Sequence, residues 1–570
     1  MKKALITLCL LVCMLGFAIP ESARTPPGSY GIALADLNGD GNLDAVVTNM
    51  CTTQADCTNG SISVLLGNGD GTFQAGVIYS SGGYGAFRVA IADLNGDGHP
   101  DIVVANGCVS VSNCSTGSVG VLLGNGDGTF KSAVSYPSGG MYAYSVAIGS
   151  LRGNSKLDLI VANVCQTGSS TCTKGAQNLN LGVQTFCTSG SLNCTNVNGA
   201  VGVLLGNGDG TFASTVSYGS GGVGAFSVAT GIFNGSNLSV VVTNSCASTG
   251  DCSHGTVAAL LGNGNGTLQS AVSYSTGGLD PEFVVVGDFN GDSKLDLAVV
   301  NDCATSFASA CPHGLVSAND SSFGILLGHG DGTFGSVVNY SLSGEWPVSS
   351  AAAADVNADG KLDLIIGQRM IAGDDVTVAL GNGDGTFQSS VAYAGTDFGN
   401  TSPVAIGDVN GDSKPDVVFT NLYNFGSPAI GGHWPNDSAY SLLGNGDGTF
   451  SPTNVIFTPN PLAFGTVASG TKVETLTVTN LSSGKTTVTF SGTPTITGTG
   501  AGQFSVLPYV SGSQSTCLQT SPKLILQPGA TCTFTIQFTS TGLGTTYNVT
   551  LNISDNGVGG SQPVGMTATD

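Results

Sequence analysis

The sequence predicts an all-β chain in which a seven-bladed β-propeller is followed by a small immunoglobulin-like β-sandwich. Two short motifs alternate along the 570 residues, and each occurs seven times. Glycine contributes 87 residues and charged residues only 9%, while 41% of the chain is hydrophobic. This composition is typical of many short strands joined by tight turns. No long stretch repeats apolar residues at helical spacing, so we expect almost no helix.

The N-terminus has the features of a secretory signal peptide. Two lysines precede an apolar run that is short for a membrane span, and Gly16-Phe17-Ala18 offers a small-x-small cleavage site. We expect residues 1–18 to be removed, or residues 1–23 if cleavage is later. A lipoprotein would need a small residue before Cys13, where Val12 stands. No later segment has about 20 uninterrupted apolar residues, so we expect no transmembrane segment in the mature chain.

The cysteines and the net charge indicate a secreted or cell-surface protein. Two of the 16 cysteines lie in the signal peptide, and the other 14 fall into the neighbouring pairs 51/57, 108/114, 165/172, 187/194, 246/252, 303/311 and 517/532. Local, even pairing in an exported chain predicts disulfides, whereas a metal site would need pairs with C-x-x-C-like spacing. The net charge of −22 argues against nucleic acid as a partner, because its phosphates would repel the chain.

The first repeated motif is an acidic nonapeptide. Intact copies start at Asp36 (DLNGDGNLD), Asp93 (DLNGDGHPD), Asp288 (DFNGDSKLD), Asp355 (DVNADGKLD) and Asp408 (DVNGDSKPD). Two copies are degenerate, because SLRGNSKLD from Ser150 keeps one carboxylate and IFNGSNLS from Ile232 keeps none and is one residue shorter. A β-branched run such as AVVTN or IVVAN follows each copy, which predicts a strand after each loop.

The second motif, LGNGDGTF, follows the first in step. It begins at Leu66, Leu123, Leu205, Leu380 and Leu443, with variants at Leu261 and Leu327. Each unit therefore predicts four strands: A before the acidic loop, B after it, C ending at the LG of the second motif, and D running from the Phe of GTF to a Tyr. Four strands in some fifty residues suit one propeller blade, and seven blades over residues 24–455 close a ring.

These paired motifs resemble the FG-GAP or VCBS repeats of integrin-alpha-type propellers over roughly residues 29–455. The spacing of the acidic loop itself favours calcium, which takes six to eight oxygen ligands at about 2.3–2.6 Å. Side chains at positions 1, 3, 5 and 9 of the loop can converge with the backbone carbonyl of position 7. Glycine at position 6 permits the left-handed turn, and Ser293 and Ser413 there predict weaker binding.

The resemblance implies the same ligand roles, so we expect about five calcium ions, one for each intact loop. The expected ligands are Asp36, Asn38, Asp40, Asn42, Asp44; Asp93, Asn95, Asp97, His99, Asp101; Asp288, Asn290, Asp292, Lys294, Asp296; Asp355, Asn357, Asp359, Lys361, Asp363; and Asp408, Asn410, Asp412, Lys414, Asp416. Asn42, His99, Lys294, Lys361 and Lys414 would contribute their backbone carbonyls. The alternative is an Asx turn without metal, and this is our prediction for the two degenerate loops.

LGNGDGTF is predicted to be a hairpin turn rather than a metal site, because Asn-Gly and Asp-Gly between two strands supply positive φ. In an up-and-down blade the A–B loops and C–D hairpins share one face, and the B–C loops and D–A crossings share the other. The second face carries the cysteine pairs of the propeller. It also carries aromatic residues that could bind a protein or glycan ligand, or could instead pack between blades: Tyr84, Phe87, Tyr142, Tyr144, Phe226, Trp346, and His433 with Trp434.

Residues 456–570 lack the repeats and predict a separate sandwich. They are rich in Thr, Ser and Val, and contain alternating segments such as ETLTVTN, CTFTIQF and NVTLNIS. Together with LQPGATCTFTIQFTS, these segments resemble the abnormal-spindle/hydin-type (ASH) sandwich of exported bacterial proteins. Cys517 and Cys532 are expected to form its disulfide.

No catalytic motif stands out, so we do not expect an enzyme. The sequence has no H-E-x-x-H, no G-x-S-x-G and no phosphate-binding G-x-x-x-x-G-K. The leading interpretation is an exported calcium-binding propeller for adhesion or recognition, with carbohydrate as one ligand class and calcium in a structural role. The alternatives are a polysaccharide-active propeller enzyme and a purely structural cell-surface protein.

Overall fold

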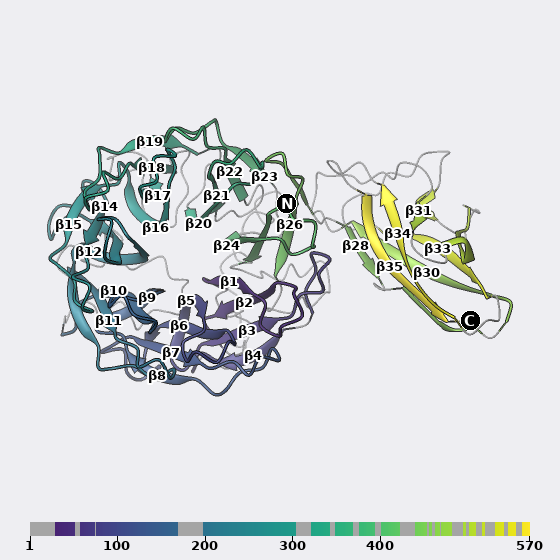
Figure 1. The fold of residues 1–570 in the computed structure, drawn as a ribbon, viewed down its shortest axis with the longest axis horizontal. Helices are drawn as coiled ribbons and strands as arrows, with labels where there is room; N and C mark the ends of the chain where they lie inside the picture. The colour runs from purple at the N-terminus through teal and green to yellow at the C-terminus, as the bar shows by residue number, and fades with distance from the viewer. Residues whose placement is uncertain are drawn as a thin grey trace, which may run out of the picture.

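The computed structural model describes residues 29–51, 58–74, 76–168, 198–303, 321–342, 348–368, 376–393, 401–421, 439–452, 455–458, 462–467, 469–480, 494–497, 501–508, 516–518, 531–540, 545–554 and 561–569. These residues form β-strands and two short 3-10 helices, η4 (Ala501–Gln503) and η5 (Thr516–Leu518). Within this part of the chain, no helix is long and apolar enough to cross a membrane. The all-β prediction is therefore confirmed (Figure 1).

Seven blades follow one another along the chain and form a ring (Figure 1). The first three contain β1 (Ile32–Ala35), β2 (Asp44–Asn49), β3 (Ser61–Leu65) and β4 (Val77–Ser80); β5 (Tyr84–Ala92), β6 (Asp101–Cys108), β7 (Ser118–Leu122) and β8 (Val134–Pro137); and β9 (Met141–Gly149), β10 (Asp158–Cys165), β11 (Asn198–Leu204) and the first part of β12 (Val216–Gly231). The fourth contains the rest of β12, β13 (Ser239–Cys246), β14 (Thr256–Leu260) and β15 (Val272–Ser275).

The last three blades contain β16 (Leu279–Gly287), β17 (Asp296–Cys303), β18 (Ser322–Leu326) and β19 (Val338–Ser341); β20 (Val348–Ala354), β21 (Asp363–Gln368), β22 (Val376–Ala379) and β23 (Val391–Tyr393); and β24 (Thr401–Gly407), β25 (Asp416–Asn421), β26 (Tyr440–Gly444) and β27 (Phe450–Pro452). Each blade is antiparallel with its strands in sequence order, and the third and fourth share β12 in one seven-stranded sheet, β9–β15.

The outer strand of each of the first six blades starts later than the sequence predicts, whereas β27 of the seventh begins at Phe450. In the first blade, Phe73 forms only an isolated bridge with Gly67, and β4 begins at Val77. The turn explains the interruption, because the amide of Gln74 donates to the carbonyl of Leu66 at 2.8 Å and closes the hairpin before the outer strand starts. The same bridge recurs at Gly124–Phe130, Gly206–Phe212, Gly262–Leu268, Gly328–Phe334 and Gly381–Phe387.

Neighbouring blades contact each other through the second repeated motif and the outer strand. The outer-strand Tyr of one blade packs edge-on against the GTF Phe of the next, in the pairs Tyr79–Phe130, Tyr136–Phe212, Tyr274–Phe334, Tyr340–Phe387 and Tyr393–Phe450. Aromatic pairs of this kind stabilise an interface beyond the area they bury. The Phe of the hairpin motif is therefore an inter-blade contact as well as the residue that closes the hairpin.

Arg88 of β5 lies near the axis of the ring. Its guanidinium donates to the carbonyl of Tyr30 at 2.7 Å and to that of Ser349, in β20, at 2.6 Å. It also lies over the rings of Tyr144, in β9, and Phe283, in β16. Tyr30 belongs to the first blade and Tyr144 to the third, while Phe283 belongs to the fifth and Ser349 to the sixth. Arg88, a buried cation from the second blade, therefore connects opposite sides of the ring.

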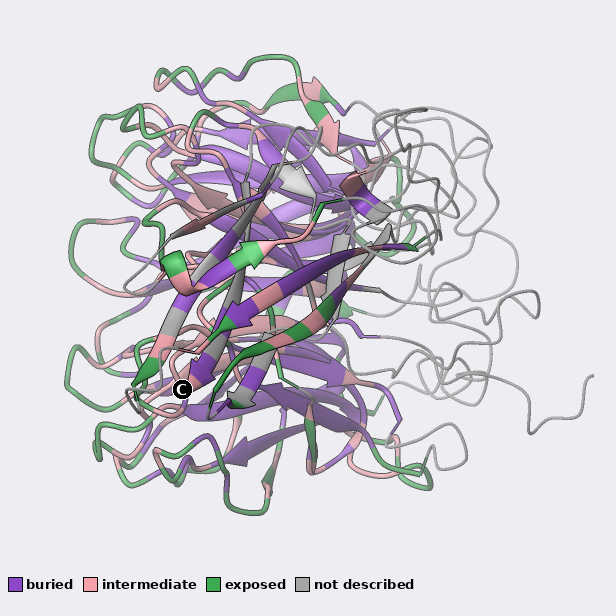
Figure 2. Ribbon diagram, turned by 90° about the vertical axis from the view of Figure 1, so that its right-hand side faces the viewer, coloured by how far each residue is buried: buried purple, intermediate pink, exposed green. Residues whose placement is uncertain are grey.

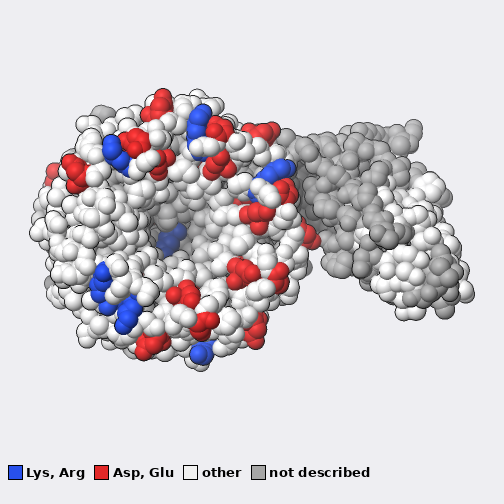
Figure 3. All heavy atoms as spheres, in the orientation of Figure 1, with Lys and Arg blue, Asp and Glu red and all other residues white. Residues whose placement is uncertain are grey.

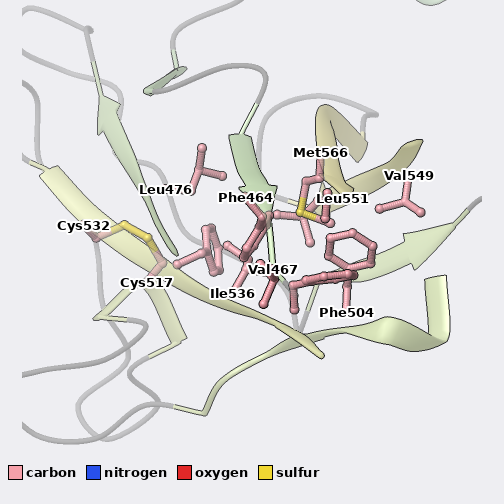
Figure 4. Close-up of a cluster of buried hydrophobic side chains, with 13 residues drawn as sticks. Phe464, Val467, Leu476, Phe504, Cys517, Cys532, Ile536, Val549, Leu551 and Met566 are labelled. Atoms are coloured by element: carbon pink, nitrogen blue, oxygen red, sulfur yellow. A yellow bond between two sulfur atoms is a disulfide. The ribbon is translucent and has the colours of Figure 1, made fainter. Parts of the chain in front are cut away.

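The remaining strands form the predicted sandwich of two four-stranded sheets. One contains β28 (Val455–Thr458), β30 (Thr471–Asn480), β33 (Thr531–Thr539) and β32 (Phe504–Val506), and the other β29 (Leu462–Thr466), β35 (Ser561–Thr569), β34 (Thr546–Ser554) and β31 (Thr495–Thr497). Phe464, Phe534 and Leu551 are among its fully buried side chains, and Cys517 is bonded to Cys532 as expected (Figure 4). The first of these strands, β28, begins at Val455 and pairs with β30.

Candidate metal-binding loops

The A–B loops and C–D hairpins lie on one face of the ring. Figure 2 shows a row of exposed and partly buried loops along one side of the blades, and Figure 3 shows acidic atoms, with basic atoms beside several of them, around the central hollow of that face. The link between the two kinds of loop is direct, because the amide of Gly67, in the first hairpin, donates to Asp44 at the end of the first acidic loop at 2.7 Å. This arrangement agrees with the predicted division of the loops between two faces.

Each intact loop is folded around its first aspartate. In the first loop the carboxylate of Asp36 accepts hydrogen bonds from the amides of Gly39, Asp40 and Gly41 at 2.7, 3.2 and 2.9 Å. The amide group of Asn38 donates to Asp40 at 3.0 Å, so positions 3 and 5 are adjacent. The loops starting at Asp93, Asp288, Asp355 and Asp408 repeat the position-1 bonds to the amides of positions 5 and 6.

The left-handed turn at position 6 is formed by serine as well as by glycine. Gly41 has φ of 87°, and Ser293 and Ser413 adopt 66° and 64° at the same position. The amides of both serines still donate to the first aspartate of their loops, at 2.8 and 2.7 Å. The serine loops therefore keep the turn of the glycine loops at the cost of a conformation that non-glycine residues seldom adopt.

The last aspartate of the loop has a structural role that the sequence reasoning missed. Asp44 is fully buried, and its two oxygens accept hydrogen bonds from the amides of Leu37, at 2.8 Å, and Gly67, at 2.7 Å. Asp101, Asp158, Asp296, Asp363 and Asp416 make the same pair of bonds. Position 9 thus fastens each acidic loop to the hairpin of its own blade. The sequence held one signal of this role, because the degenerate loop at Ser150 keeps the aspartate at position 9 although it has lost its other carboxylates.

Burial of these last aspartates disfavours their charged form. Desolvation raises the pKa of Asp44, Asp101, Asp296 and Asp363 above the ordinary value and that of Asp416 to about 6, and nearby aspartates of the same loops raise it further. In contrast, the exposed Asp40 has a lowered pKa, because it accepts a hydrogen bond from the amide of Asn42 and another from the side chain of Asn38. The loop therefore combines a buried carboxylate that would gain from a cation with an exposed one that is readily ionised.

The side chains at position 7 lie over the first glycine of the NGDG turn, which is Gly69 in the first blade. Lys294, Lys361 and Lys414 form ion pairs with the position-5 aspartates of their own loops at 3.0, 3.3 and 3.4 Å. Asn42 and His99 occupy this position in the first two blades. Because the three lysine pairs are exposed, each contributes little to stability, but each places a cation beside an expected calcium ligand.

The hairpins are turns, as predicted. Gly69 and Gly71 have φ of 73° and 86°, and Asp70 accepts hydrogen bonds from the amide and the hydroxyl of Thr72 at 3.0 and 2.5 Å. The second glycine of the NGDG turn also contacts the preceding blade in the ring. Its amide donates to the carbonyl at position 2 of that blade's acidic loop, in Gly128–Leu37, Gly266–Leu151, Gly332–Phe233, Gly385–Phe289, Gly448–Val356 and Gly71–Val409.

The loops fit calcium by donor chemistry, although their acidic groups are not gathered around one point. Among the described residues, no three His, Cys, Asp or Glu side chains are placed together as a metal site. Position 1 is partly buried and position 5 is exposed, while position 9 lies inside the blade. A carboxylate has about four lone-pair positions, so Asp44 keeps acceptor capacity beyond its two amide bonds. Calcium ligation remains a prediction. It would require the carboxylates at positions 1 and 5 to turn toward the aspartate at position 9.

The opposite face carries the disulfides and a buried aromatic cluster. Cys108–Cys114 and Cys246–Cys252 are bonded as predicted, and Cys51, Cys165 and Cys303 are also disulfide-bonded, although their expected partners lie outside the described residues, as do Cys187 and Cys194. Phe87, Tyr142 and Tyr144 are buried in one cluster, against which Tyr84 and Phe226 are partly buried. For these residues the packing alternative is correct. Trp346, His433 and Trp434 lie outside the described residues.

Comparison with known proteins supports the repeat assignment for part of the ring. The FG-GAP-like repeat family matches residues 36–104, 315–366 and 370–419. No match supports the expected ASH family for the sandwich, and no curated protein matches the chain. One solved structure is described as the structural basis of specific recognition of non-reducing terminal N-acetylglucosamine by an Agrocybe aegerita lectin. The match covers 75% of this chain and 79% of the chain of that structure, at 16% identity and a TM-score of 0.30. At that score it supports no conclusion.

Proposed function

We propose that the chain is an exported recognition or adhesion protein whose propeller is stabilised by calcium in the five intact A–B loops. One observation supports calcium most directly. Five loops bury a carboxylate at position 9 beside two further aspartates, whereas the loop that lacks those two aspartates places Arg152 against its buried Asp158 instead. A buried charge requires compensation, and oxygen donors in this order suit calcium.

Bound calcium would supply positive charge at the loop, and the residues of the chain would hold the ion in place. Asp36, Asn38 and Asp40, with their counterparts, would hold the ion at the exposed end, and Asp44 would hold it from inside the blade. Because Asp44 is also bonded to Leu37 and Gly67, the ion would fasten strands β1 and β2 to the hairpin that contacts the neighbouring blade.

Recognition is proposed for the opposite face, which carries the disulfide-bonded loops. Local disulfides such as Cys108–Cys114 restrict loops that would otherwise lose entropy on binding. FG-GAP-like repeats are typical of extracellular recognition propellers, and the disulfides are typical of an oxidising compartment. The ligand would be a protein or a glycan, and the propeller would act by binding rather than by catalysis.

Arrays of glycans and of extracellular-matrix proteins, probed with the mature chain in calcium and in chelator, test this proposal. We expect saturable binding to a defined ligand class that weakens after chelation, because the blades carrying the binding face would loosen. Binding to no ligand, or the release of new reducing ends from a polysaccharide during incubation, would contradict it.

A further inference from the structure

The third blade keeps the buried aspartate of the acidic loop but not its acidic neighbours. Asp158 is fully buried and accepts the amides of Leu151 and Gly206, both at 2.9 Å, as its counterparts do in the intact loops. Positions 1 and 5 are Ser150 and Asn154, so the loop has lost two of its three carboxylates. The hairpin attachment has therefore been retained where the metal donors have not.

An arginine lies where a cation would be needed. Arg152 occupies position 3, which is asparagine in all five intact loops. Its Nη2 donates to Asp158 Oδ1 at 2.5 Å and to the carbonyl oxygen of Gly206 at 2.6 Å, and its side chain is 21% exposed. The guanidinium thus neutralises the buried carboxylate and also links the loop to the hairpin.

The fourth blade removes the charge instead of compensating it. Ser239 stands in place of the last aspartate, and its hydroxyl accepts the hydrogen bond from the amide of Gly262 at 3.1 Å. The same hydroxyl donates to the carbonyl of Asn237 at 3.2 Å. A neutral group makes the hairpin attachment here, so this loop needs no cation.

We infer that β9–β15, the third and fourth blades, form a metal-independent sector of the ring, in which Arg152 takes the part of the calcium ion in the third blade. The inference rests on the proposed calcium-stabilised function and deepens it. Calcium would then hold the five other blades, while the sector that also shares the continuous strand β12 keeps its loops attached when calcium is removed.

The backbone of the third loop agrees with the intact loops at position 4 but not at position 6, where Ser155 lacks the positive φ of Ser293. Gly153 has φ of 61°, comparable with 74° at Gly291 in the fifth blade. Asn154 accepts the amide of Lys156 at 3.0 Å, as Asp292 accepts that of Lys294 at 3.0 Å. With Ser150→Asp, Arg152→Asn and Asn154→Asp together, the loop would match the loop starting at Asp288 except for leucine at position 2.

Calcium content of the full-length mature chain after equilibrium dialysis against micromolar calcium provides the first test. We expect the triple variant to bind about one calcium more than the wild type, because six loops would then carry the full set of oxygen donors. An unchanged content in a variant with the wild-type circular dichroism spectrum would overturn the inference alone. A wild-type chain that binds no calcium would overturn the proposed function, and the inference with it.

Hydrogen exchange of the wild-type chain gives a second test that does not depend on the triple variant folding. After chelation, exchange should accelerate in segments containing the amides of Leu37 and Gly67, and should change little in those containing Leu151 and Gly206. Arg152→Gln should accelerate exchange in the latter segments even in calcium, and Arg152→Lys, which keeps the charge, should restore part of the protection. Equal acceleration of both sets of segments by chelation would contradict a metal-independent sector.

Discussion

The amide of Gly71 in the first blade donates a hydrogen bond to the carbonyl oxygen of Val409 in the seventh, at 2.9 Å. This bond joins the two ends of the ring, since neither blade borrows a strand from the other. Val409 also donates its amide to the buried Asp416 at 2.9 Å. The closure of the ring is thereby connected to the acidic loop of the last blade.

Substitution of Gly71 should open this contact. A Cβ atom at Gly71 would lie 2.8 Å from Cδ2 of Leu443, and φ is positive, whereas Gly235 has a similar φ with nothing within 4 Å. Gly71→Ala should therefore lower the free energy of unfolding by about 1 kcal/mol more than Gly235→Ala, the low end of overpacking costs, because the end of the Leu443 side chain must shift in addition to the backbone strain. Denaturant titration of both variants measures the difference. Equal losses would show that the Leu443 contact is not restrictive.

The two acidic positions of one loop should respond differently to calcium. Asp363 is buried and accepts the amides of Val356 and Gly381 at 3.0 and 2.8 Å, whereas Asp359 is exposed. In chelator, Asp363→Ala should destabilise the chain by about 2–4 kcal/mol, because two buried donors lose their acceptor, while Asp359→Ala should be nearly neutral. In calcium both variants should lose stability. Thermal unfolding in the two conditions decides this, and a neutral Asp363→Ala in chelator would contradict the structural role.

Arg88 should contribute strongly to the stability of the propeller through its contacts at the centre of the ring. Arg88→Met keeps much of the volume but removes the donors to Tyr30 and Ser349, so it should cost about 2–5 kcal/mol. Lys131→Met is a matched control, because Lys131 is exposed. Chemical denaturation of the two variants gives the comparison. A loss no larger than that of the control would mean that the axial contacts are dispensable.

The two kinds of disulfide should act on different parts of the chain. Replacing Cys108 and Cys114 by serine opens a short loop, which the loop-entropy model values at about 2–3 kcal/mol, and should lower only the propeller transition. Replacing Cys517 and Cys532 should lower only the sandwich transition, because both are buried in the sandwich core. Calorimetry resolves the two transitions, and a shift of the sandwich transition by the first pair would contradict independent unfolding.

The sequence predicted the architecture well because the repeats carry it. Periodic motifs placed the four strands of each blade, the hairpins and the local disulfides, as at Cys108–Cys114. The role of the ninth loop position was missed, because a carboxylate that accepts backbone amides and one that binds a metal have the same sequence. Arg88 could not be predicted either, since its partners Tyr30 and Ser349 lie 58 and 261 residues away.

Calorimetry of the whole mature chain, with calcium and with chelator, tests the central claim most directly. A ligand that binds only the folded state stabilises it by about 2.7 kcal/mol per site at a hundredfold excess over Kd, and several sites in one ring should add at least partly. The account predicts that chelation lowers the melting temperature of the propeller markedly and leaves the sandwich transition, from β28–β35, nearly unchanged. A propeller transition at the same temperature in calcium and in chelator would contradict it.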